Sequence, residues 1–237
     1  MVALATCTRP RSAVGAVSAT RFVSVEDLYD YDELRKLDVP TVFVAQVKSA
    51  TLVLGGNQLI DVVDVSRTPA VRRRRGGGGL VLLRPDDLWI DWWIPHGDPL
   101  WSHDVRVSSI QVGNWWADVL RERTRDEVRV HEGSLKGDPT FRVVCFAGRG
   151  PGEVFVNDRK AVGLTQWRVR EGVFVSTVLH AGPTTDVLEY LRDPPAGLEE
   201  ALDHHTLTSL SLGARDTLVA QLTKASGLFQ VRPRLFV

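Results

Sequence analysis

The amino-acid sequence predicts an α+β domain in which a mixed or antiparallel β-sheet is layered with helices. The chain has 237 residues, 43% of them apolar, which is enough for one sizeable core. Between residues 41 and 180, runs of β-branched and aromatic residues alternate with turn residues, a pattern typical of strands. After Pro194-Pro195 the apolar residues recur at helical spacing. Strands followed by segregated helices are typical of α+β folds.

The first strands are expected soon after the N-terminal region. Residues 1–25 hold three arginines among Ala, Ser, Val and Thr, and no acidic residue precedes Glu26. We expect a disordered tail over 1–25, although an organellar transit peptide has the same composition. Residues 26–237 are expected to form a single domain. Within it, the runs 41–47 and 51–54 are rich in β-forming residues, and a short helix is expected over 58–67.

Two further strands and a long helix are predicted in the middle of the chain. The runs 80–83 and 88–94 are separated by turn residues, and the apolar residues of 110–120 repeat at helical spacing. Alternate residues of a strand face opposite sides, so Trp92 is expected on one face of the second run and Trp89 on the other. We expect these rings to lie mainly in the core, under the helix that carries Trp116. A cage for an aromatic ligand is the alternative interpretation.

An antiparallel meander is expected between residues 142 and 180. Strands are predicted over 142–147, 153–156, 160–169 and 173–179, with a tight turn at Asn157-Asp158. Two helices are expected later, one around Leu198 to Leu202 and one around Leu218 to Leu222.

Charge and cysteine content exclude several classes of function. The chain has 29 basic and 29 acidic residues and no net charge, whereas general nucleic-acid binders need a basic surface. No apolar run reaches the ~18 residues that span a bilayer. Cys7 and Cys145 are too few for a disulfide framework, and the histidines are scattered. We therefore expect a cytoplasmic protein without nucleic-acid or membrane partners and without a metal site of its own.

The run Arg72-Arg73-Arg74-Arg75-Gly76-Gly77-Gly78-Gly79 is the first candidate for a binding site. Glycines allow backbone N–H groups to approach a ligand closely, and guanidinium groups match phosphate or carboxylate. The apolar residues that follow tie this loop to a buried strand. A basic run taken alone is more often a solvated loop. The attached strand favours an anion-binding loop instead.

A second motif follows about 80 residues later and completes a family resemblance. The first run resembles the pattern Arg-Arg-x-Ser-Gly-Gly-Gly-x-Val, and residues 158–166 resemble Gly-Arg-Lys-x-x-Gly-Ser-Ala-Gln. The ordered pair resembles the biotin/lipoate protein ligase superfamily, most closely the lipoate-protein ligase A group. The resemblance implies that 26–237 is one catalytic domain, which activates lipoate with ATP and Mg²⁺ and passes the acyl group to a lysine. That lysine belongs to a lipoyl carrier domain of 2-oxoacid dehydrogenase or glycine cleavage complexes.

The resemblance also assigns roles to particular residues. Lys160 is implied as the catalytic cation that stabilises charge on the reacting carbonyl. We expect its side chain to be partly exposed at a strand edge. The adenylate-binding residues implied by the two motifs are Arg73, Arg74, Gly77, Gly78, Gly79, Gly163 and Thr165. No tightly bound cofactor is implied. Gly76 and Leu164 stand where the family has serine, which leaves the acyl substrate and the activity open.

Cys145 supports an alternative mechanism. It lies 15 residues before Lys160, which resembles the cysteine-dependent octanoyltransferases of the same superfamily. In that case Cys145 would take octanoyl from acyl carrier protein as a thioester. A small buried cysteine in a strand is the simpler interpretation. The short C-terminal region leaves no room for the accessory domain of many lipoate ligases, so a separate accessory protein is a further expected partner. A non-catalytic acyl-binding module is the remaining hypothesis.

Overall fold

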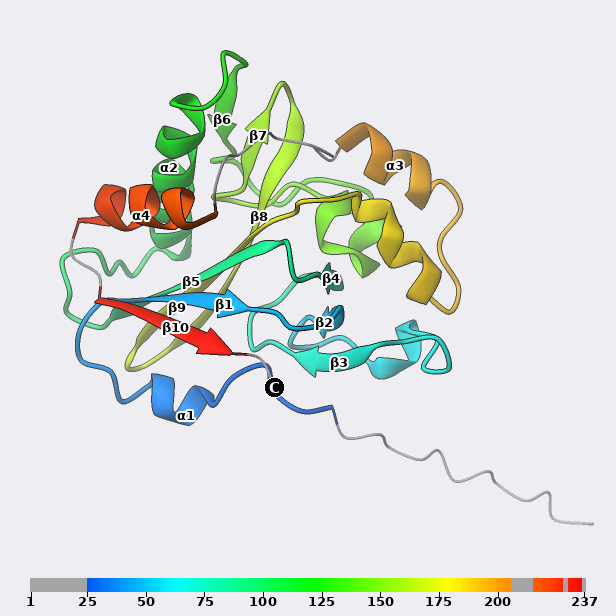
Figure 1. The fold of residues 1–237 in the computed structure, drawn as a ribbon, viewed down its shortest axis with the longest axis horizontal. Coiled ribbons are helices and arrows are strands. Elements are labelled where there is room, and N and C mark those ends of the chain that lie inside the picture. The colour runs from blue at the N-terminus through cyan, green and yellow to red at the C-terminus, as the bar shows by residue number, and fades with distance from the viewer. Residues whose placement is uncertain (1–24, 206–214, 228–229, 236–237) are drawn as a thin grey trace, which may run out of the picture.

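The computed structural model describes residues 25–205, 215–227 and 230–235. The tail expected over 1–25 therefore lies outside the described residues, apart from Val25. The fold is α+β, as predicted, with two β-sheets and helices packed against them (Figure 1). None of the helices in the described part of the chain is long and apolar enough to cross a bilayer.

Seven strands form the larger sheet, in the order β10-β1-β5-β9-β8-β7-β6. All neighbours are antiparallel except β1 and β10, which are parallel. The strands are β1 (Thr41–Gln46), β5 (Leu88–Pro95), β6 (Val128–Val130), β7 (Val154–Val156), β8 (Arg159–Val169), β9 (Gly172–Leu179) and β10 (Gln230–Leu235). The predicted meander is confirmed from β7 to β9. Asn157 and Asp158, at φ angles of 45° and 65°, make its tight turn.

The smaller sheet has three strands in the order β3-β2-β4. They are β2 (Thr51–Leu54), β3 (Ala70–Arg73) and β4 (Val81–Leu83), with β2 parallel to β3 and antiparallel to β4. The arginine run was expected in a loop, but β3 includes Arg72 and Arg73. The glycines therefore form the connection between two strands of one sheet, β3 and β4.

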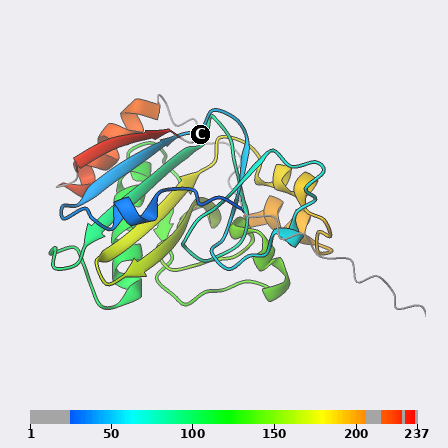
Figure 2. The same ribbon diagram turned by 90° about the horizontal axis from the view of Figure 1, so that it is seen from below.

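The larger sheet separates two hydrophobic cores. Helices α2 (Val105–Arg121) and α4 (Arg215–Ser226) pack on one face, and α1 (Tyr31–Leu34), α3 (Leu198–His205) and the smaller sheet pack on the other. Figure 2 shows the smaller sheet and α3 grouped at the same side of the molecule. In β5, Trp92 contacts the α2 core and Trp89 the opposite core, which confirms the predicted alternation. The tryptophans of this strand are core residues, because they are at most 2% exposed.

The prediction of a strand over 142–147 is wrong. The chain there forms two 3₁₀ helices, η2 (Pro139–Val143) and η3 (Cys145–Ala147). Asp138 caps the first by accepting a hydrogen bond from the N–H of Thr140 (2.8 Å), and Pro139 supplies a helical φ angle. The only β-bridge of this described segment joins Val144 to Leu80. Two more 3₁₀ helices are η1 (Ile60–Val62), which replaces the helix expected over 58–67, and η4 (Thr184–Tyr190).

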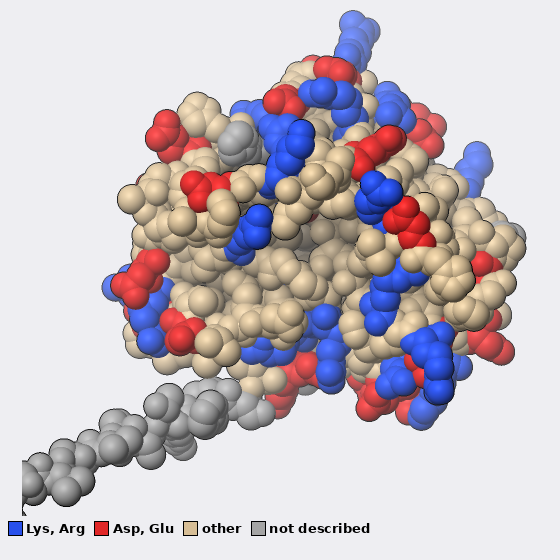
Figure 3. All heavy atoms as spheres, turned by 180° about the vertical axis from the view of Figure 1, so that it is seen from behind, with Lys and Arg blue, Asp and Glu red and all other residues tan. Residues whose placement is uncertain are grey.

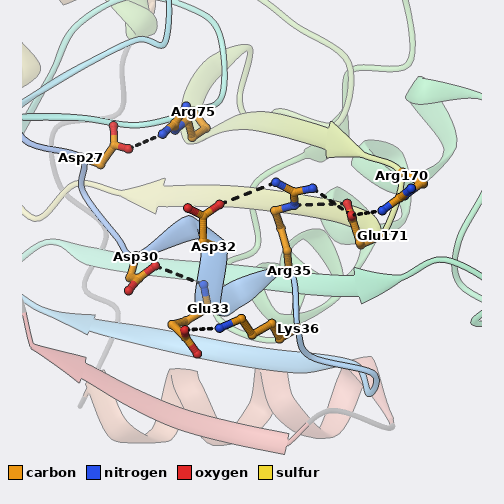
Figure 4. A network of polar contacts seen from close by, with 9 residues as sticks. All are labelled: Asp27, Asp30, Asp32, Glu33, Arg35, Lys36, Arg75, Arg170 and Glu171. Atoms are coloured by element: carbon orange, nitrogen blue, oxygen red, sulfur yellow. Dashed lines mark hydrogen bonds and ion pairs between the residues drawn. The ribbon is translucent and has the colours of Figure 1, made fainter.

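Ion pairs attach α1 and the residues before it to the rest of the fold (Figure 4). Arg35 donates two hydrogen bonds to Glu171 in the β8–β9 turn, at 3.2 and 2.8 Å. These bonds lower the pKa of Glu171 to about 2. Arg75 donates to Asp27 at 2.6 Å. Residues 27–35 are thus linked both to the large sheet and to the arginine run.

Candidate functional site

The two sequence motifs meet at one cavity of about 350 Å³. Its walls come from the glycine loop 77–79, the first turns of α2, residues between 135 and 153, and residues 164–166 of β8. In the view from behind, the molecule has a hollow near its centre, with uncharged residues inside, Lys and Arg side chains on both sides, and Asp and Glu side chains beside some of them (Figure 3). No tryptophan lines the cavity, so the aromatic-cage alternative receives no support.

The glycine loop contributes unpaired backbone donors to this cavity. Gly77, Gly78 and Gly79 all line it, and their N–H groups make no hydrogen bond to any described residue. The carbonyl of Gly77 points toward Arg74, so the N–H of Gly78, in the same planar peptide, points away from Arg74. Gly78 has a φ angle of +88°, which favours glycine. Free N–H groups in a glycine loop are suited to an anionic ligand.

Arg73 and Arg74 hold this loop from behind. Arg74 is 1% exposed, and its guanidinium donates to the carbonyls of Val53 (3.1 Å), Gly77 (2.8 Å) and Gly79 (2.7 Å). Burial lowers the pKa of Arg74. Arg73 donates to the carbonyl of Gly55 (3.0 Å) in the turn after β2. Neither guanidinium lines the cavity. The two side chains were expected to bind the ligand, but in this structure they hold the backbone of the loop in place.

Lys160 lies directly behind the cavity wall. Its side chain is 1% exposed, and its ammonium donates to Glu153 (2.6 Å) and to the carbonyls of Cys145 (2.8 Å) and Gly148 (2.9 Å). These three acceptors match the three N–H donors of an ammonium group. All three acceptor residues line the cavity. The sequence had indicated a partly exposed lysine at a strand edge, and this expectation is wrong because the 145–153 segment covers the side chain.

Glu153 and Phe146 complete the surroundings of Lys160. Burial raises the pKa of the Glu153 carboxyl, and the nearby Lys160 charge partly offsets this effect. Glu153 also accepts the N–H of Gly150 at 2.6 Å. The ring of Phe146 lies under the ammonium, 4.9 Å from nitrogen to ring centroid. The sequence offered one weak signal for the Glu153 pair: the Asn157-Asp158 hairpin turn brings β8, which carries Lys160, beside β7, which Glu153 directly precedes.

Gly163 and Thr165 occupy different places relative to the cavity. A side chain at Gly163 would meet Phe146, since a Cβ there would lie 2.7 Å from the ring, and Gly163 does not line the cavity. Thr165 does line it, and its hydroxyl donates to the carbonyl of Gly77 at 2.9 Å. Gly163 therefore makes room for the ring beneath Lys160, while Thr165 joins β8 to the glycine loop.

Cys145 reaches the cavity from η3. The side chain is half-buried, and the thiol is free. The N–H of Cys145 donates to the carbonyl of Leu80 (3.0 Å), which sets the residue beside the glycine loop. A Cβ built on Gly78 would lie 4.0 Å from the Cys145 Sγ. The structure thus brings Cys145, the glycine loop and Thr165 together, with Lys160 one layer behind.

The close approach of Gly79 to residues 142–145 gives a direct test of this arrangement. A Cβ at Gly79 would lie 2.4 Å from the Arg142 carbonyl oxygen and 2.8 Å from the Cys145 nitrogen, whereas a Cβ at Gly77 has no neighbour within 4 Å. We expect Gly79→Ala to lower the free energy of unfolding by about 1–3 kcal/mol, because backbone must move apart. Gly77→Ala is the matched control. Equal urea unfolding midpoints for the two variants would contradict the packing described here.

No group of three or more His, Cys, Asp or Glu side chains that could hold a metal ion occurs among the residues that the structure describes. The sequence matches no protein-family model and no curated protein.

Solved structures resemble this fold over most of the chain. Lipoate-protein ligase A bound with ATP is 17% identical, with a TM-score of 0.62 over 87% of this chain and 82% of that one. A bipartite lipoate protein ligase studied with its E2 lipoyl domain, from Thermoplasma acidophilum, is 13% identical, with a TM-score of 0.62 over 87% and 80%. Protein Ta0514 of T. acidophilum with bound lipoic acid is 16% identical, with a TM-score of 0.61 over 87% and 82%.

The chain therefore has an α+β fold. This fold is the one found in these lipoate-protein ligase structures, as the two motifs predict.

Proposed function

We propose that this protein transfers a lipoyl or octanoyl group to a lysine of a lipoyl carrier domain through an acyl-adenylate. Lipoate and ATP with Mg²⁺ are the proposed substrates. The observation that carries the proposal is the cavity at which both motifs meet, because it combines unpaired glycine N–H groups with a buried ammonium one layer behind. The likeness to a ligase structure with ATP and to a structure with lipoic acid supports it.

The residues of the cavity suit separate parts of an acyl-adenylate. The N–H groups of Gly77, Gly78 and Gly79 bind the phosphate, and Arg73 and Arg74 keep the loop in place. The acyl chain lies against the apolar wall that includes Val144 and Leu164. Lys160 approaches the reacting carbonyl by giving up one backbone acceptor of the 145–148 segment, and it stabilises the charge that develops as the carrier amine attacks. Gly163 leaves room for Phe146 behind the cavity, and Thr165 holds β8 against the glycine loop.

The proposed protein partner is the lipoyl carrier domain of a 2-oxoacid dehydrogenase or glycine cleavage complex. One structure with the same fold was studied with its E2 lipoyl domain, which supports this choice. That ligase is bipartite, which also supports an accessory protein as a second partner. A cytoplasmic location and a single catalytic domain over 26–237 remain part of the proposal.

Cys145 favours a second candidate function, octanoyl transfer from acyl carrier protein. Its thiol lines the cavity beside the glycine loop, where an acyl carbonyl would lie. In this scheme the Cys145 thiolate attacks the donor thioester, and the carrier thiol leaves with a proton. The lysine amine of the lipoyl domain then attacks the Cys145 thioester, which releases the Cys145 thiol. No ATP is consumed.

One assay separates these functions. Purified protein is incubated with an unmodified lipoyl domain in two mixtures, one with lipoate, Mg²⁺ and ATP and the other with octanoyl acyl carrier protein. The mass of the lipoyl domain is then measured by mass spectrometry. A lipoyl adduct that requires ATP supports the ligase. An octanoyl adduct formed without ATP supports the transferase. If neither mixture modifies the domain, the acyl-transfer proposal fails and a non-catalytic acyl-binding module becomes the better explanation.

The substitution Cys145→Ser distinguishes the two mechanisms within the protein. For the ligase, we expect the variant to retain most ATP-dependent lipoylation, because the thiol forms no bond in that reaction. For the transferase, we expect a loss of at least about 10²-fold, because a serine hydroxyl without a base is a poor nucleophile. Initial rates of lipoyl-domain acylation provide the measurement. A hydroxylamine-sensitive octanoyl adduct on wild-type Cys145 would decide for the transferase.

A further inference from the structure

Exposed apolar side chains gather at the mouth of the cavity. Val105 is 51% exposed and Leu135 56%, and both are among the large hydrophobic side chains that the described part of the chain leaves exposed. Val105 and Leu135 line the cavity from different segments, the start of α2 and the segment before η2. Apolar residues gathered around an opening are typical of a protein-docking surface.

Unpaired cations lie beside these apolar residues. Lys136 and Arg142 line the cavity and are exposed, and neither side chain makes a hydrogen bond or ion pair with any described residue. Arg106 is paired with Asp104 at 3.1 Å, and Asp138 accepts hydrogen bonds from the neutral Thr140 and so keeps its negative charge. The two unpaired cations outnumber this one carboxylate, so the rim carries a net positive charge.

We propose that the rim formed by Val105, Leu135, Lys136 and Arg142 is the docking surface for an acidic carrier domain. This inference rests on the proposed function, which requires a carrier to insert its lysine into the same cavity. The apolar pair contacts the partner beside its lysine, and the two cations meet carboxylates around it. Because the whole chain carries no net charge, this local positive surface orients the partner.

The test measures binding without chemistry. An unmodified lipoyl domain is titrated calorimetrically into wild-type protein and the variant K136E/R142E, without ATP or acyl donor, at low and physiological salt. We expect the double variant to raise Kd by at least about tenfold, and the wild-type Kd to rise more steeply with salt. We expect Leu135→Ser to raise Kd and to leave the dependence of Kd on salt concentration as it is in wild type. The control K48E/K224E reverses two exposed cations outside the cavity and should bind like wild type.

Each outcome bears on the docking surface separately from the activity. Three results would contradict the proposed docking surface. The variant K136E/R142E could bind the lipoyl domain as tightly as wild type, the control could lose as much affinity as this variant, or wild type could fail to bind the lipoyl domain. If wild type acylates the lipoyl domain while K136E/R142E binds it normally, the surface is wrong and the activity stands. If wild type binds but acylates nothing, and the double variant binds at least about tenfold more weakly, the surface stands and the proposed activity falls.

Discussion

Replacing Lys160 by alanine should both abolish most acyl transfer and destabilise the protein. The buried ion pair with Glu153 is 1% and 4% exposed, so the substitution leaves a carboxylate without its partner. Removing one member of a buried pair costs about 3–5 kcal/mol. Loss of the positive charge near the reacting carbonyl should lower the rate by about 10²-fold or more. Urea unfolding and the initial rate of lipoyl-domain acylation measure the two effects.

The stability loss in Lys160→Ala should depend on pH. Burial already raises the pKa of Glu153 above its ordinary 4.5, and removal of Lys160 takes away the opposing effect. The folded variant then binds a proton that the unfolded chain has released, so its stability falls as pH rises from 4.5 toward the raised pKa. Below that window the carboxyl is neutral in both states, and the stability loss should be smallest.

The double variant Lys160→Met with Glu153→Gln is the control for this prediction. It removes both charges, so its stability should recover toward that of wild type while its activity remains low. Lys160→Arg should not restore full activity, because a planar guanidinium cannot donate to the same three acceptors as a compact ammonium. Near wild-type acylation by Lys160→Ala would show that the lysine is structural and that the proposed catalytic role is incorrect.

Replacing Arg74 by alanine should also have a large effect, because its guanidinium connects β2 to the glycine loop. The substitution leaves the carbonyls of Val53, Gly77 and Gly79 without this donor, and Gly77 keeps only Thr165. Each buried carbonyl left unsatisfied costs about 1–3 kcal/mol. We therefore expect a large fall in unfolding free energy and weaker calorimetric binding of a non-hydrolysable acyl-adenylate analogue.

Arg75→Ala is the matched control within the same arginine run. Arg75 is 52% exposed and pairs with Asp27 at the surface, so its loss should change stability by less than about 1 kcal/mol. If both variants unfold at the same urea concentration, Arg74 does not support the loop. If Arg74→Ala is as stable as wild type but no longer binds the analogue, Arg74 contacts the ligand directly, as the sequence alone had indicated.

The sequence by itself determined the fold class and the elements whose signals are local. The β7–β9 meander, the Asn157-Asp158 turn and the two-faced strand β5 follow from alternation and turn chemistry, which depend on neighbours along the chain. The ordered pair of motifs also indicated the ligase fold, because both are short runs of glycines and cations that can be recognised from neighbours along the chain.

The tertiary structure decided what each polar residue of the motifs contacts. Arg74 is directed at backbone carbonyls because β3 and β4 place the glycine loop around it, and no local pattern encodes that loop closure. Residues 139–143 form a 3₁₀ turn that the Asp138-Pro139 cap begins, and a single bridge to Leu80 follows at Val144, so the local β propensity does not decide the structure. Lys160 is buried because this irregular segment folds over it. Burial of a charged group is decided by partners distant in sequence, so only the tertiary structure reveals it.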